Sequence, residues 1–150
     1  MARGAGTRDG GPMAIVMRAL GIGLAAVAAN LLMSLGDDGE SGANIGAGLA
    51  IFAALAGGGF VWALLDGLDL RGAPDRERPG ALALLIRWAL VAVGAVAVIV
   101  LAMTLRQGPG YVPDVGAGSL AFLVALVLLP AVAGALIGWA ARPAVPTPAN

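Results

Sequence analysis

The sequence predicts an all-α membrane protein, a single bundle of four transmembrane helices with both termini in the cytoplasm. Hydrophobic residues make up 59% of the 150-residue chain and charged residues only 12%, whereas an ordinary soluble domain has about 25% charged residues. The apolar residues gather in four runs, residues 13–35, 44–65, 81–105 and 119–141. Each run is close to the roughly 20 residues that cross a bilayer as a helix.

Each of these runs is predicted to be a helix, because a segment surrounded by lipid must satisfy its backbone groups internally. A transmembrane barrel would instead show short segments of alternating hydrophobicity, which the sequence lacks. The predicted domain covers residues 13–141. The Gly-rich residues 1–12 and the Pro-rich residues 142–150 are predicted to be disordered cytoplasmic ends.

The arginines predict the orientation. With a cytoplasmic N-terminus, Arg106 alone lies near the outer face, and the other eight arginines lie near the inner face, in agreement with the positive-inside rule. Those eight are Arg3, Arg8, Arg18, Arg71, Arg76, Arg78, Arg87 and Arg142. We also expect the three tryptophans, Trp62, Trp88 and Trp139, to be anchors at the cytoplasmic interface.

Small residues recur at every fourth position of two predicted helices. Such residues let membrane helices approach closely, so they are predicted packing positions, either within the bundle or between copies of it. They are Gly42 just before the second run, Gly46, Ala50, Ala54 and Gly58 within it, and Gly134 and Gly138 in the fourth.

Three residues are candidates for lining or shaping a transport path. Asn30 and Ser34 are polar residues on one face of the first run, and Pro130 interrupts the hydrogen bonding of the fourth. The alternative is structural: Asn30 bonds a neighbouring helix, and Pro130 only shapes its own. Arg18 and Arg87 are expected to extend from the ends of their runs to the lipid headgroups.

The loop between the second and third runs is the most charged internal segment. Together with Arg87 of the third run, it forms a candidate cytoplasmic charge cluster, whose other members are Asp66, Asp69, Arg71, Arg76 and Arg78. If the helix continues through Asp66 and Asp69, both carboxylates oppose its dipole unless a cation compensates them. A solvated hairpin that fixes the orientation is the simpler interpretation.

Several classes of function are excluded by composition. The chain has no Cys, no His and no Lys, so it lacks the usual nucleophile pairs, transition-metal ligands and phosphate-loop lysine. Its net charge is zero and its arginines are scattered, which argues against binding of nucleic acid. We therefore expect neither an enzyme nor a cofactor or metal site.

A family resemblance rests on short motifs spread over most of the chain. They are "RALG" at residues 18–21, Trp62 followed by "DGLDLRGAPD" at 66–75, Arg87 with Trp88, and Pro130 in a helix ending "GWAAR". In these the chain resembles the actinobacterial four-helix membrane proteins assigned to the bacterial drug/metabolite transporter superfamily. The resemblance implies a plasma-membrane protein with an export or permease role. Small multidrug exporters share the helix count but use a Glu in helix one, and residues 13–35 contain no acidic residue.

The sequence thus predicts a small bacterial plasma-membrane transporter, or a transporter-like subunit, of unknown substrate. Four helices enclose too little space for a path, so its expected partners are lipid and further copies of itself or another membrane protein. The alternative is a structural or regulatory membrane protein whose charged cytoplasmic hairpin, residues 66–78, docks a partner.

Overall fold

The structure, a computed structural model, describes residues 12–35, 45–68 and 80–141. Its elements are α1 (Pro12–Ser34), α2 (Ile45–Phe52), the π-helix η1 (Ala53–Gly57), α3 (Gly58–Leu68), α4 (Ala81–Gln107) and α5 (Tyr111–Ala140). The described chain is therefore all-helical, as predicted. The expected disordered ends, residues 1–12 and 142–150, lie outside the described residues except for Pro12, which begins α1.

Within the described residues, four helices are long and apolar enough to cross a membrane. The predicted second run is one continuous span, formed by α2, η1 and α3 together, and it ends at Leu68 rather than at residue 65. The fourth helix begins earlier than predicted, at Tyr111, but Gly116 interrupts it with a positive φ of 69°. A glycine adopts this conformation without steric cost, and the membrane-length part of α5 begins at Val115.

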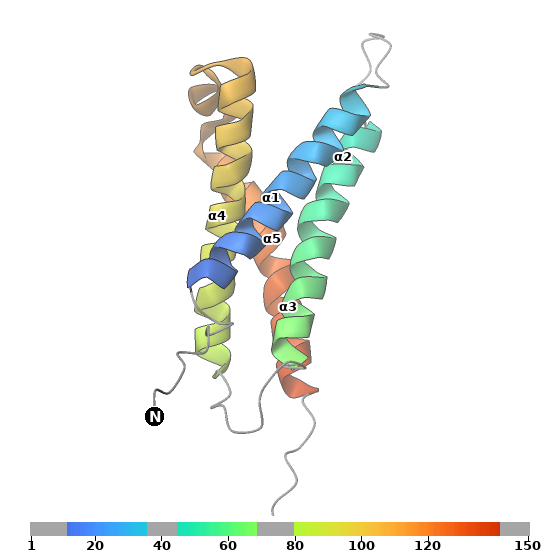
Figure 1. Ribbon diagram of the computed structural model, residues 1–150, viewed down its shortest axis with the longest axis vertical. Helices are drawn as coiled ribbons and strands as arrows, with labels where there is room; N and C mark the ends of the chain where they lie inside the picture. The colour runs from blue at the N-terminus through green and yellow to red at the C-terminus, as the bar shows by residue number, and fades with distance from the viewer. Residues whose placement is uncertain (1–11, 36–44, 69–79, 142–150) are drawn as a thin grey trace, which may run out of the picture.

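The four long helices alternate in direction (Figure 1). In the lower part of the view, α1 and α4 consequently begin and α3 and α5 end. Extensive contacts join α1 to α4, α3 to α5 and α4 to α5, whereas α1 meets the second span mainly through α2 and η1. The bundle is thus built from two closely packed pairs, α1/α4 and α3/α5.

The buried core lies where these pairs meet. Leu55, Trp88, Val91 and Val127 are its largest completely buried side chains. Large apolar side chains also cover the outside of the helices, for example Leu101, which is 61% exposed. An apolar exterior of this extent is unusual for a protein in water and fits a bundle surrounded by lipid.

Glycines bring the backbones of α3 and α5 into close contact. A Cβ atom added to Gly67 would lie 2.5 Å from the carbonyl oxygen of Ala135, closer than any real contact. One added to Gly138 would collide with the carbonyl oxygen of Leu64. Because only glycine fits these positions, the α3/α5 pair is held by backbone-to-backbone packing.

Candidate functional site

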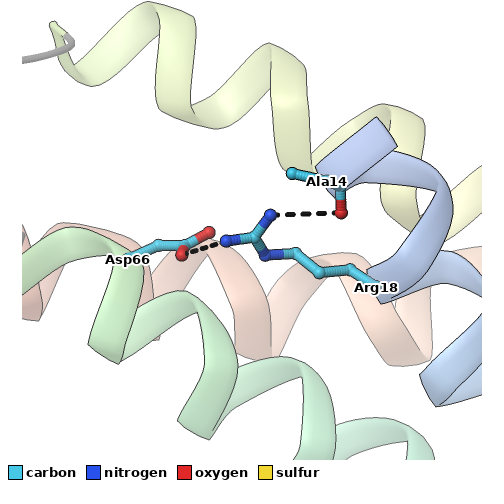
Figure 2. Close-up of polar contacts among 3 residues, drawn as sticks. All are labelled: Ala14, Arg18 and Asp66. Atoms are coloured by element: carbon cyan, nitrogen blue, oxygen red, sulfur yellow. Dashed lines mark hydrogen bonds and ion pairs between the residues drawn. The ribbon is translucent and has the colours of Figure 1, made fainter. Parts of the chain in front are cut away.

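Arg18 and Asp66 form an ion pair between the first and second spans (Figure 2). Nη2 of Arg18 lies 2.6 Å from Oδ1 of Asp66, and each side chain is only 13% exposed. Nη1 of Arg18 donates a second hydrogen bond, 3.1 Å long, to the carbonyl oxygen of Ala14 one turn earlier in α1. The guanidinium is therefore held between its own helix and α3.

The helix positions of the two residues explain why they meet. Arg18 lies six residues after the start of α1, and Asp66 lies two residues before the end of α3. Because α1 and α3 run in opposite directions, both positions lie near the same end of the bundle. One turn further into the bundle, the Trp62 ring of α3 lies against Gly21 of α1, where an added Cβ would be 3.0 Å from the ring. These two neighbouring contacts form what we call the α1–α3 seam.

Arg87 brings a second cation to this site from α4. It is half-buried and lies within electrostatic range of both Asp66 and Arg18. Like Arg18, it lies six residues after the first residue of its helix, so both are about 9 Å from that helix end at 1.5 Å per residue. The expectation that Arg18 extends to the headgroups is wrong: its charge is used inside the bundle, where a carboxylate compensates it.

The sequence did not indicate that Arg18 is the cation that compensates Asp66. The expected partners were arginines of the following loop and Arg87, but the partner that bonds Asp66 is Arg18, 48 residues earlier in the chain. A usable signal was present, because Arg18, Asp66 and Arg87 all fall near the cytoplasmic ends of their predicted helices.

Two members of the predicted charge cluster, Asp66 and Arg87, are thus brought together. The other four, Asp69, Arg71, Arg76 and Arg78, lie outside the described residues.

The ion pair uses only part of its bonding capacity. A guanidinium and a carboxylate can form two parallel hydrogen bonds, but this pair forms one. Nε of Arg18 and Oδ2 of Asp66 are buried and have no hydrogen-bond partner among the described residues. The same holds for the indole nitrogen of Trp88, whose side chain is completely buried in the core.

The predicted path residues do not lie at the level of the ion pair. Asn30 is half-buried and twelve residues beyond Arg18 in α1, which corresponds to about 18 Å along the helix. Pro130 is half-buried within α5, ten residues before Ala140, or about 15 Å from that end. Ser34 ends α1, and its side chain is not among those described.

The three tryptophans occupy different environments. Trp139 is 44% exposed and Trp62 is 39% exposed, as side chains at a lipid interface can be. Trp88 is completely buried, so its indole ring cannot anchor the bundle to headgroups as predicted. The reason is that its side chain points into the core of the bundle, where it packs with residues such as Leu84 and Val91.

The predicted packing positions make close helix contacts in α5 but not in the second span. Gly134 and Gly138 are buried against α3.

In the second span the positions that face α5 are Gly59 and Gly67, with Ala63 buried between them. These positions lie one residue beyond the predicted series. The predicted positions are instead open or only half-buried: Gly46 is exposed, Ala50 and Ala54 are half-buried, and Gly58 has open space beside it. Gly42 lies outside the described residues.

An open apolar groove lies between α2 and α5, away from the ion pair. Its volume is about 470 Å³, and its walls include Leu49, Phe52 and Phe122. All three side chains are at least half exposed. The groove offers no charged group to a ligand, so the charged site at the α1–α3 seam is the stronger candidate for specific recognition.

Comparison with known protein families, with curated proteins and with solved structures finds no match. The resemblance to four-helix proteins of the drug/metabolite transporter superfamily therefore stays a prediction.

Proposed function

We propose that the chain is a multi-pass protein of the bacterial plasma membrane and acts, as an oligomer, as a small transporter or transporter-like subunit. The observation that supports this most is the ion pair of Arg18 and Asp66. The two side chains come from different spans, and each is 13% exposed. Charged side chains within membrane spans are costly, and they commonly mark substrate or ion pathways.

The need for an oligomer follows from how little space the bundle leaves. The α3/α5 pair is closed by glycine contacts, and the described core is filled by apolar side chains. A further copy is therefore required to complete a path. Gly57 and Gly58 have open space beside them, which gives a second copy a surface that its backbone can approach closely.

Transport is tested by complementing a deletion strain of the source bacterium. The strain is challenged with a panel of toxic cations, toxic anions and antibiotics, and is complemented with the wild-type gene, Asp66→Asn or Arg106→Gln. We expect the wild type and Arg106→Gln to restore the same growth phenotype, because Arg106 is exposed at the other end of α4. Asp66→Asn, at an equal level in the membrane, should restore at most about a tenth of the effect. Full complementation by Asp66→Asn would contradict the proposed role of the site.

The oligomer is tested by oxidative crosslinking in native membranes. The natural chain has no cysteine, so Gly58→Cys introduces a unique thiol on the proposed contact surface. We expect a disulfide-linked dimer from Gly58→Cys and little from Leu101→Cys, a matched position on the exposed face of α4. Monomers alone, both in membranes and in mild detergent, would contradict an oligomeric transporter.

A further inference from the structure

We propose that Arg18 is an exchangeable oxyanion site: a ligand bearing a phosphate or carboxylate group replaces Asp66 on the guanidinium and so opens the α1–α3 seam. This inference rests on the proposed transport function and deepens it, because it names the chemical class that the site accepts. It follows from the bonding of the ion pair, from the charges around it and from the way the helices pack.

The ion pair leaves some of its hydrogen-bonding groups unused. Arg18 donates one hydrogen bond to Asp66 and another to the carbonyl oxygen of Ala14. Nε of Arg18 and Oδ2 of Asp66 have no hydrogen-bond partner among the described residues. A mobile oxyanion can align with two guanidinium N–H groups, an arrangement that strengthens binding as well as orienting it. It can therefore compete with a carboxylate that the α3 backbone holds in a one-bond position.

Arg87 adds positive charge near Arg18. An anion at Arg18 also experiences the field of Arg87, which lies within electrostatic range of Arg18. Asp66 is the only acidic residue within the four candidate membrane spans, so no other carboxylate of these spans competes for the position. Guanidinium groups are well suited to phosphate and carboxylate because their planar geometry matches that of the oxyanion.

The ion pair connects α1 and α3 at a contact that side chains make. Backbones approach closely where Gly67 meets α5, and also where Gly23 of α1 meets Ala95 of α4. The α1–α3 seam is different, because it is made by side chains: the ring of Trp62 against Gly21, and Asp66 against Arg18. Loss of the ion pair therefore weakens the seam while the α1/α4 and α3/α5 pairs stay intact.

The position of the site near one end of the bundle admits two sources of oxyanion. Arg18 lies about 9 Å along α1 from its first residue. The phosphate of an anionic lipid and a soluble phosphate offer the guanidinium the same chemistry. The spin-label experiment has a separate arm for each source.

The test measures the separation of α1 and α3 by electron paramagnetic resonance. Spin labels are attached at Met17→Cys and Leu65→Cys, which are exposed neighbours of Arg18 and Asp66; the natural chain has no other cysteine. The labelled full chain is placed in phosphatidylcholine vesicles, with inorganic phosphate or chloride at equal ionic strength, or in vesicles that also contain phosphatidylglycerol. Only phosphate and phosphatidylglycerol are expected to increase the population with the longer distance.

A soluble oxyanion source predicts saturation: about 90% of the responsive molecules shift at a phosphate concentration tenfold above the midpoint. A lipid source predicts the shift in phosphatidylglycerol vesicles without added phosphate. Asp66→Asn should show the longer distance under every condition, and Arg106→Gln should respond as the wild type does. If Asp66→Asn does not fold, the comparison of phosphate with chloride in the wild type decides alone.

Two results would overturn the inference: no shift with either source, or the same shift with chloride, which would indicate screening rather than exchange. A failure of the transport proposal gives a different pattern. In that case the distance responds to the oxyanion, but deletion and complementation change no growth phenotype.

Discussion

At the scale of residues, the most informative observation is that one largely buried carboxylate is compensated from another helix. Asp66 is close to the C-terminus of α3, where the helix dipole disfavours an anion, and Arg18 of α1 supplies the opposing charge at 2.6 Å. A buried ion pair loses much of its attraction to desolvation, so it contributes more to which helices meet than to overall stability.

This balance predicts a non-additive pair of substitutions. Arg18→Leu and Asp66→Leu should each lower the free energy of unfolding by about 3 kcal/mol, because each leaves one charge buried without its partner. The double variant should recover most of that loss, since two apolar side chains replace a pair that was costly to desolvate. Equilibrium unfolding in mixed detergent micelles measures all three. If the loss in the double variant equals the sum of the losses in the two single variants, a direct interaction is contradicted.

The sequence was sufficient to predict that Asp66 needs a cation but not which one. Position along the chain favoured the arginines of the following loop, whereas the bond is made by a residue 48 positions away. The choice depends on which helices are neighbours, and apolar membrane helices carry little sequence information about that. Trp88 was misplaced for a related reason: an indole at a predicted membrane boundary can face either lipid or the core, and here it faces the core.

At the scale of elements, the existence of the four helices was predictable and their facing surfaces were not. Length and hydropathy determine a membrane span, which is why the predicted runs overlap all four observed spans. The π-helix η1 has no comparable signature, and it precedes the glycines that face α5. The glycines that face α5, Gly59 and Gly67, lie one position beyond the predicted series of small residues.

Two glycines of α3 test this assignment. Gly67→Ala should lower the free energy of unfolding by about 1–3 kcal/mol, because its methyl group forces the α3 and α5 backbones apart. Gly58→Ala should change the unfolding free energy of the single bundle by less than about 1 kcal/mol, because a Cβ there meets no atom of the same chain and alanine favours helix. The same micelle titration compares them. Equal destabilisation by both would show that the α3/α5 contact is not where the glycines place it.

At the scale of the whole molecule, the alternating helices give the bundle two unlike ends. Arg18, Asp66 and Arg87 all lie toward the end where α4 begins, and Arg106 lies at the opposite end. Arginine is retained on the cytoplasmic side during insertion. By the positive-inside rule, this asymmetry is what the predicted orientation requires, with the α1–α3 seam near the cytoplasmic surface.

This orientation predicts which helix ends react with an impermeant maleimide. Gly80→Cys, just before α4, should be labelled only after the cells are permeabilised, and Gln107→Cys, at the other end of α4, should be labelled in intact spheroplasts. Both positions are exposed, and each variant carries a single thiol because the natural chain has none. A mixed pattern, with about half of each variant labelled from outside, would indicate insertion in both directions. That result would remove the argument for a single orientation and would place half of the Arg18 sites at the outer face.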